Sequence, residues 1–90
     1  MKEQPLETGA IVLSRAGRDR GRAFVVIEVL DSEYVLMADG QLRTLDRPKK
    51  KKRKHLLKGS DARMELKPHL LDADVRRFLL AQGYRNDRKE

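Results

Sequence analysis

Residues 9–30 read GAIVLSRAGRDRGRAFVVIEVL, and this stretch decides the fold that the sequence predicts. Two apolar segments rich in β-branched residues, Ala10–Leu13 and Phe24–Leu30, flank a basic segment, and such a composition favours β-strands. Between them Gly17 and Gly21 lie four positions apart, where glycine permits the positive φ angles that a tight loop needs. The stretch therefore predicts two strands joined by a short basic loop.

The composition indicates a polyanionic partner for such a loop. The chain has 90 residues, of which 39% are charged, and a formal net charge of +7. A strong positive charge favours RNA or DNA, with an acidic membrane surface as the other physical option. Aromatic residues make up only 4%, so a broad base-stacking platform is not expected. The length fits one domain with a small core.

The loop carries the first group of candidate RNA-binding residues, which are Arg15, Arg18, Arg20, Gly21 and Arg22. Guanidinium groups and backbone amides are common donors to phosphate. The alternative is a solvated loop whose charges only keep the protein soluble. Asp19 lies among these cations, where a free carboxylate would repel phosphate. We therefore expect Gly17 and Asp19 to shape the loop, with Asp19 accepting from loop amides or pairing with an arginine.

Further strands are expected after the basic loop. Tyr34–Ala38 predicts a third strand, and Asp39–Gly40 is a hairpin signal that predicts a fourth strand over Gln41–Leu45. His55–Leu57 is compatible with a short fifth strand, and Lys58–Asp61 is expected to be a loop. Short strands at this spacing favour a meander that closes into a small barrel.

A basic run lies between the expected fourth and fifth strands. Seven of the eight residues from Arg47 to Lys54 are Lys or Arg, and Pro48 is the exception. Such a run repels itself and stays extended until it is neutralised, so we expect a mobile arm at 47–54 that becomes ordered on RNA. The same composition also resembles a nuclear import signal. The candidate RNA-binding residues here are Lys49, Lys50, Lys51, Lys52, Arg53, Lys54 and His55.

The C-terminal part predicts one helix over residues 71–84. Its apolar face is formed by residues at helical spacing, namely Leu71, Val75, Phe78 and Leu79. Asp72 is expected to cap the N-terminus, and Gly83 to end the helix with Tyr84 folding back on Leu79. The expected organisation is a flexible N-terminus at 1–7, a barrel with its basic arm at 8–58, a connecting segment at 59–70, the helix, and a loose tail at 85–90.

The strand–loop–strand stretch resembles the KOW motif. The residues that carry the resemblance are Gly9, the apolar Ile11 and Leu13, the core Gly17–Arg22, and the alternating Val25 and Ile27. KOW segments occur in ribosomal proteins and transcription elongation factors. The resemblance implies a small SH3-like β-barrel, here followed by the C-terminal helix, with the glycine-bounded loop as a site for RNA.

A longer resemblance extends beyond this core. Residues 35–43 (VLMADGQLR), the basic segment 47–51 and His55–Leu56 are similar to the large-subunit ribosomal protein of archaea and eukaryotes with an N-terminal KOW barrel, and to its small bacterial relatives. The resemblance covers residues 8 to 57. It implies a ribosome-associated protein that binds structured RNA, ribosomal RNA on or near the large subunit, through phosphate contacts. The absence of cysteine fits a reducing cytoplasm, so a cytoplasmic location is expected.

The sequence favours neither catalysis nor a metal site nor a membrane span. No Ser–His–Asp or Cys–His set and no Walker-type loop is apparent, so neither an enzyme nor a cofactor is expected. His55 and His69 lie 14 positions apart with no cysteine in the chain and no paired acid at ligand spacing. No apolar run approaches the roughly 18 residues of a spanning helix, and the first residues lack the apolar core of a signal peptide.

Two other functions are open from the sequence. SH3-like barrels in elongation factors also contact proteins, so the chain could be a protein-interaction module of a transcription or translation factor, with the basic run as an auxiliary tether. DNA would use the same charges. Salt separates RNA binding from the protein-interaction module, since phosphate contacts weaken steeply with salt and an apolar interface does not. The sequence predicts no particular oligomeric state.

Overall fold

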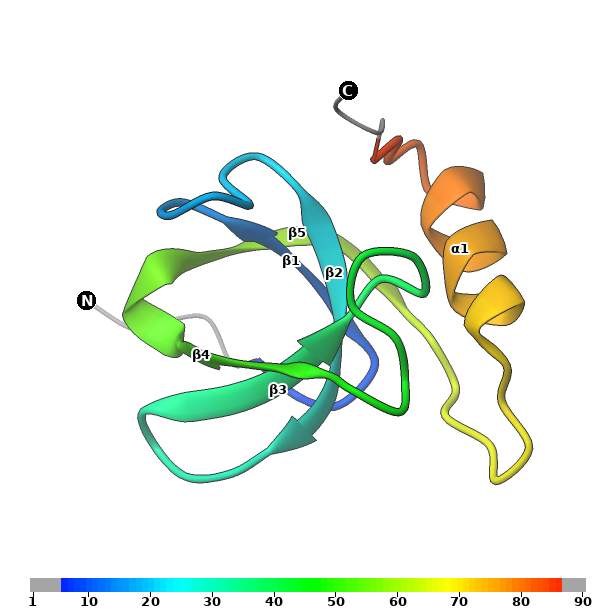
Figure 1. Ribbon diagram of the computed structural model, residues 1–90, viewed down its shortest axis with the longest axis horizontal. Coiled ribbons are helices and arrows are strands. Elements are labelled where there is room, and N and C mark those ends of the chain that lie inside the picture. The colour runs from blue at the N-terminus through cyan, green and yellow to red at the C-terminus, as the bar shows by residue number, and fades with distance from the viewer. Residues whose placement is uncertain (1–5, 87–90) are drawn as a thin grey trace.

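The computed structural model describes residues 6–86, which form one β-sheet, a short 3-10 helix and one α-helix (Figure 1). The strands are β1 (Ala10–Ser14), β2 (Ala23–Val29), β3 (Tyr34–Ala38), β4 (Lys49–Lys52) and β5 (Leu56–Arg63). The 3-10 helix η1 (Arg53–His55) joins β4 to β5, and α1 (Asp72–Ala81) follows. The expectation of a mostly β chain with a C-terminal helix is confirmed. Within this described range no helix is long and apolar enough to cross a membrane.

The sheet is antiparallel and strongly curled. The strand order is β4-β3-β2-β1-β5, so β4 and β5 lie at opposite edges although only η1 separates them in the chain. Four residue steps span at most ~14 Å, whereas the edges of a flat five-stranded sheet would lie ~19 Å apart. The sheet must therefore bend until its two edges approach each other at η1, and Figure 1 shows this curvature.

Both faces of the central strands are buried. The inner face of the curl is lined by Leu6, Ala10, Val12, Phe24, Val26, Val35, Met37 and Leu56. On the outer face, Ile11, Ala23 and Val25 pack with Val75 and Leu79 of α1. Because each face has its own cover, the first two strands are nearly continuous apolar runs rather than alternating ones.

The hairpin expected at Asp39–Gly40, with a strand over Gln41–Leu45, is wrong. The chain from the end of β3 to the start of β4 is a loop. The Asp39 carboxylate is buried, and it accepts hydrogen bonds from the amides of Gln41 (3.0 Å) and Arg43 (2.8 Å). These bonds fold the loop around the carboxylate, which prevents a two-residue turn.

The basic run, expected to be a mobile arm at 47–54, is instead regular structure over most of its length. Its four consecutive lysines form β4, with Tyr34 of β3 opposite Lys52 and Met37 opposite Lys49. The next three residues form η1. The lysines find partners on both sides of the strand, described below, and these partners offset the self-repulsion on which the expectation rested.

The strand β5 is longer than the sequence predicts. It spans eight residues, so the expected loop at Lys58–Asp61 is wrong, and the sheet continues beyond residue 58, where the barrel was expected to end. Leu57 pairs with Leu13 and Arg63 pairs with Ala10, with an irregular stretch between these pairs. The second half of β5 has few apolar side chains, and its sequence is therefore typical of a loop.

The helix α1 begins at Asp72, which is therefore its first residue and not the expected cap. The Asp72 carboxylate accepts a hydrogen bond from the amide of Leu45 (2.8 Å), and that of Asp74 accepts one from the amide of Leu71 (3.0 Å). The helix ends at Ala81, before the predicted end at residue 84, but the predicted way in which it ends is confirmed. Gly83 has a φ of 90°, and the amide of the next residue, Tyr84, donates to the carbonyl of Leu79 at 2.9 Å.

Only part of the predicted helix face is buried. Val75 and Leu79 are buried against the sheet and Phe78 is partly buried, whereas Leu71 is 64% exposed. Leu71 precedes the helix, so its side chain does not continue the apolar stripe.

The chain ends within the described range are held to the sheet. Leu6, expected in a flexible segment, is buried, and Glu7 pairs with Arg63 at 2.6 Å. Asn86, expected in a loose tail, accepts a hydrogen bond from the amide of Ala23 (2.9 Å) and donates one to its carbonyl (2.7 Å). The remaining residues of those two segments, 1–5 and 87–90, lie outside the described residues.

Gly40 allows the loop after β3 to approach the start of α1. Its φ is 79°, and a Cβ at this position would overlap the carbonyl oxygen of Asp72. The Gly40 carbonyl accepts a hydrogen bond from the guanidinium of Arg76 at 2.5 Å. The helix is therefore docked on the loop through main-chain contact that only glycine permits.

Gly40→Ala should lower the free energy of unfolding more than Gly83→Ala. Both substitutions place a side chain at positive φ, which costs ~1–2 kcal/mol. A Cβ at Gly83 meets nothing within 4 Å, whereas at Gly40 it would also displace α1, adding about 1 kcal/mol or more. Urea unfolding followed by circular dichroism measures both losses. Equal losses would show that the contact with α1 contributes nothing.

Candidate nucleic-acid interface

The loop between β1 and β2 is closed by its own main chain. Gly17 and Gly21 have φ angles of 84° and 83°, as expected for this loop. The amide of Gly21 donates to the carbonyl of Ser14 (2.8 Å), and the amide of Arg22 donates to that of Asp19 (2.9 Å). The Gly21 amide is thus used inside the loop and is not turned toward a ligand.

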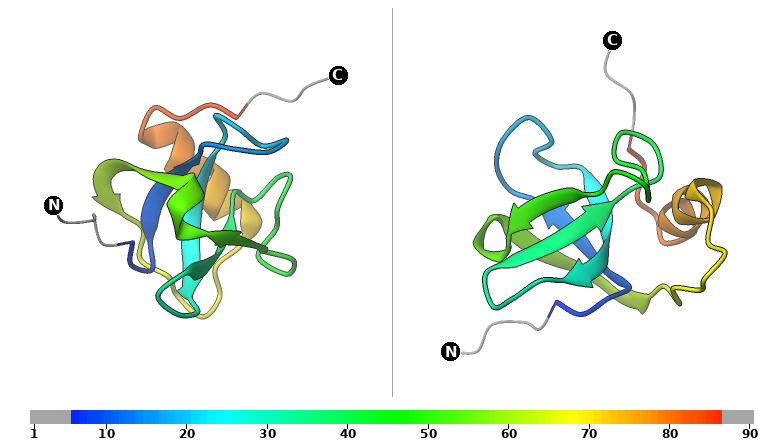
Figure 2. Two further views of the ribbon diagram at one scale, coloured as in Figure 1. Left: turned by 90° about the vertical axis from the view of Figure 1, so that its left-hand side faces the viewer. Right: turned by 60° about the horizontal axis from the view of Figure 1, so that its bottom comes forward.

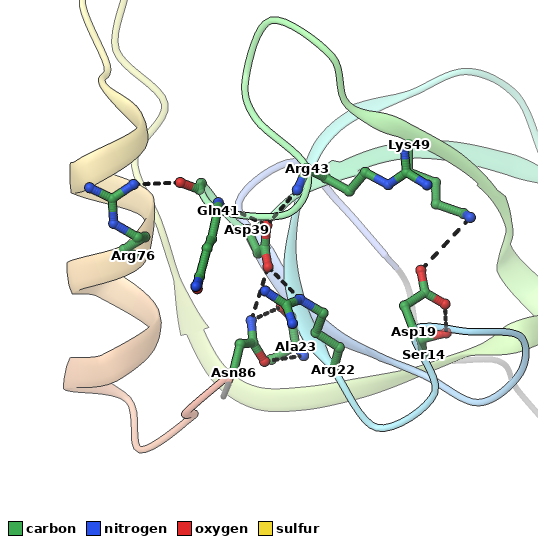
Figure 3. A network of polar contacts seen from close by, with 11 residues as sticks. Ser14, Asp19, Arg22, Ala23, Asp39, Gln41, Arg43, Lys49, Arg76 and Asn86 are labelled. Atoms are coloured by element: carbon green, nitrogen blue, oxygen red, sulfur yellow. Dashed lines mark hydrogen bonds and ion pairs between the residues drawn. The ribbon is translucent and has the colours of Figure 1, made fainter. Parts of the chain in front are cut away.

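Asp19 is buried beneath this loop and connects it to β4. The Ser14 hydroxyl donates to Asp19 Oδ1 at 3.0 Å, and Lys49 Nζ lies 3.9 Å from Oδ2 (Figure 3). Lys51 Nζ lies 3.4 Å from Oδ1. Burial raises the pKa of Asp19, but the Ser14 hydrogen bond and the charges of Lys51 and Lys49 outweigh it, so the pKa lies below its ordinary value. Asp19 has the internal position that we expected, with lysines rather than an arginine as partners.

The lysines of β4 form two pairs with opposite orientations, because side chains alternate along a strand. Lys49 and Lys51 turn toward the buried carboxylate, and only 11% of the Lys51 side chain is exposed. Lys50 and Lys52 turn the other way, with their Nζ atoms 4.6 and 5.9 Å from the centre of the Tyr34 ring. These are distances at which a cation and an aromatic face attract each other. A uniform run of charge in the sequence therefore has two structural roles.

Lys51→Ala should lower the free energy of unfolding by about 1–3 kcal/mol, because the Asp19 carboxylate would stay buried and lose a charged partner. Lys50→Ala removes the same atoms from an exposed side chain, and it should change the free energy of unfolding by about 0.5 kcal/mol or less. Denaturant unfolding of the two variants side by side makes the comparison. Similar losses in both would mean that the strand needs lysine charge in general and not this particular pair.

A second buried carboxylate engages Arg22. The Nε of Arg22 donates to Asp39 Oδ2 at 2.6 Å, and only 14% of the Arg22 side chain is exposed. The side-chain amide of Asn86 donates to the same oxygen at 3.3 Å. Figure 3 shows these groups converging from the end of the β1–β2 loop, the loop after β3 and the end of the described chain. Arg22, a candidate phosphate ligand from its sequence position, therefore belongs to an internal network.

The other loop arginines, Arg15, Arg18 and Arg20, are exposed and form no ion pair with any residue between 6 and 86. Arg15 stands at the base of the loop, where its amide donates to the carbonyl of His55 at 2.8 Å. This bond ties the loop to η1, and the left view of Figure 2 shows both on the same side of the molecule. The His55 side chain is partly buried.

A groove of about 520 Å³ opens where the base of the loop, η1 and β5 meet. We call it the basic groove, because five of its lining residues are cationic: Arg15, Lys52, Arg53, Lys54 and Lys58. Its apolar part consists of Leu6, Leu56 and Leu57, and the turn before β3 adds Ser32 and Glu33. The basic groove thus combines a concentrated positive potential with an apolar surface.

The basic groove unites some of the residues singled out from the sequence. Arg15 comes from the first candidate segment, and Lys52, Arg53 and Lys54 come from the second. Arg18, Arg20 and Lys50 are exposed beyond it, and Lys49 and Lys51 face Asp19.

Sequence reasoning missed Lys58 and Glu33 as residues of this site. Lys58 was assigned to a loop, although a strand over 56–63 would have placed it on the same face as Leu56. Glu33 lies in a turn far from the basic run in sequence, and only the fold brings it to the groove.

Comparison with protein-family models and with curated proteins gave no match. Among residues 6–86, no group of three His, Asp or Glu side chains is placed to hold a metal ion. The function is therefore argued from the charge and shape of the site.

Proposed function

We propose that the protein is a KOW-type, SH3-like barrel that binds structured RNA, with ribosomal RNA on or near the large subunit as its target. The observation that carries the proposal is the basic groove, in which five cationic side chains converge from three parts of the chain. Lys and Arg that neutralise phosphates release counterions, and this release supplies most of the affinity for RNA. The curled five-stranded sheet and C-terminal helix are compatible with such a barrel.

The distribution of charge supports phosphate contacts over base reading as the main source of affinity. Arg18 and Arg20 extend the positive surface from the groove along the loop, and Lys50 extends it along β4. Proteins that bind double-stranded RNA contact its phosphates and recognise its shape, because the deep, narrow major groove of the RNA hides the base edges. Few aromatic residues are present to stack on bases. In this proposal the protein acts as a binding module without catalysis.

Replacing two cations of the groove, Arg15→Ala with Lys54→Ala, should weaken binding to an RNA hairpin and flatten its salt dependence. The slope of log K against log salt is negative, and each lost phosphate contact reduces its magnitude by ~0.7–0.9. The magnitude of the slope should therefore be smaller by about 1.5 in the double variant. Fluorescence anisotropy at four or five salt concentrations gives the affinity and the slope together.

The matched control is Lys67→Ala with Arg85→Ala. Both residues are exposed and neither lines the basic groove, so the variant loses the same two charges elsewhere. We expect a smaller loss of affinity and an unchanged slope. If the two double variants lose affinity and slope alike, net charge alone governs binding, and the groove is not the RNA site.

The ribosomal part of the proposal is tested by sedimentation. Tagged protein in lysate of its own cells should travel with the large subunit at low salt and leave it as the salt rises. Protein that stays at the top of the gradient at every salt concentration would remove ribosomal RNA as the target. Salt-resistant association would instead favour an apolar contact with a protein partner.

A further inference from the structure

Glu33 is the only acid among the described residues that line the basic groove. It forms no ion pair with any residue in the range 6–86, although Lys52, Arg53 and Lys54 line the same groove. A carboxylate at such a place weakens a site that serves phosphate alone, because like charges repel. It is suited to a ligand that brings both a phosphate and a hydrogen-bond donor.

The main chain around Glu33 is fixed from both sides. Asp31 Oδ1 accepts hydrogen bonds from the amides of Glu33 and Tyr34, each at 2.8 Å, and these bonds hold the pKa of Asp31 below its ordinary value. On the other side, the Glu33 carbonyl accepts from the amide of Arg53 at 2.7 Å. The turn that carries Glu33 is thereby tied to η1, which supplies cations to the same groove.

The apolar part of the groove also goes beyond what a phosphate needs. Leu6 and Leu56 are buried, but Leu57 is 50% exposed within a groove lined by cations. The face of a base gains from packing on such a side chain, since flipped-out bases stack between aromatic or apolar residues. The groove volume of about 520 Å³ falls in the range of ~300–1,000 Å³ typical of sites for small ligands, the size class of one nucleotide.

From these features we infer that the basic groove holds one unpaired cytidine of a structured RNA, an inference that rests on the proposed function. The phosphate lies against Arg15 and Lys54, the base packs on Leu57, and the exocyclic amino group donates to the Glu33 carboxylate. Carboxylates accept from the N4 amino group of cytosine. Uracil has a carbonyl oxygen at the same place, which a carboxylate repels. Bulges and loops expose this edge of the base to proteins.

The test uses three RNA hairpins that are identical except for one nucleotide: fully paired, with a bulged cytidine, and with a bulged uridine. Fluorescence anisotropy with the full chain should give about tenfold tighter binding to the cytidine bulge than to the uridine bulge. The uridine bulge should bind close to the fully paired hairpin.

Glu33→Gln separates hydrogen bonding from mere repulsion. The glutamine amide can accept from the amino group of cytosine or donate to the carbonyl of uracil, so the cytidine preference should fall to about onefold. The side chain is exposed and of equal size, so the fold is retained. Leu57→Ser should weaken binding of the hairpin with the cytidine bulge and leave the other two unchanged. Leu80→Ser, at a leucine of similar exposure on α1, should leave all three hairpins unchanged.

Each alternative result has a distinct meaning. If all three hairpins bind equally and Glu33→Gln tightens them alike, the inference is overturned while RNA binding stands. A cytidine preference that survives Glu33→Gln also overturns the inference, because another group must then read the base. If no hairpin binds at low salt, both the inference and the proposed function are overturned.

Discussion

The connection of only three residues between β4 and β5 is the constraint on which the rest of the structure depends. These strands occupy opposite edges of the sheet, so η1 can join them only if the sheet curls until its two edges approach each other. The bend encloses the inner core, which Leu6 and Leu56 help to close. The base of the β1–β2 loop also lies at η1, because Ser14 pairs with Leu56 and the adjacent Arg15 and His55 share a hydrogen bond. The basic groove forms at this meeting point because the constraint places separate basic segments together.

Part of the positive charge of this protein serves its own fold. A buried carboxylate is costly unless it is paired and hydrogen-bonded. Asp19 meets that requirement through Ser14 and two lysines of β4, and Asp39 meets it through Arg22 and amides of its own loop. Asp19 connects the β1–β2 loop to β4, and Asp39 connects the loop after β3 to Arg22; these segments are not paired in the sheet. The number of cations available to a polyanion is therefore smaller than the count of Lys and Arg in the chain suggests.

The parts of the fold that local sequence determines could be predicted, and the parts that distant partners determine could not. The first two strands are evident from runs rich in β-branched residues, the third from an apolar run, and the end of α1 from Gly83, because propensity and turn chemistry act over a few residues. The lysine strand was missed because its main partner, Asp19, is 32 residues from Lys51. The misassigned turn at Asp39 is in part an exception, because the amides of Gln41 and Arg43 that fold its loop are local. Only Arg22 and Asn86 reach the Asp39 carboxylate from distant positions.

The candidate site divides in the same way. Arg15 and Lys52–Lys54 could be named from the density of charge in the sequence. Arg22 could not be separated from the other loop arginines, because its pairing with Asp39 depends on how the loop after β3 folds back. Glu33 carries no local signal that marks it as part of a binding surface, and its relevance follows only from its position beside η1.

The position of β4 at the border of the sheet has a consequence for how these molecules behave toward one another. An edge strand leaves main-chain donors and acceptors without partners, and such a row readily recruits a strand from a neighbouring chain. Here the row is carried by four successive lysines, so a second copy approaching it would set ammonium against ammonium. Lysine is one of the residues that natural proteins use to blunt exposed edges. The lysine charges that we propose to act on RNA thus also oppose the growth of the sheet into a continuous aggregate.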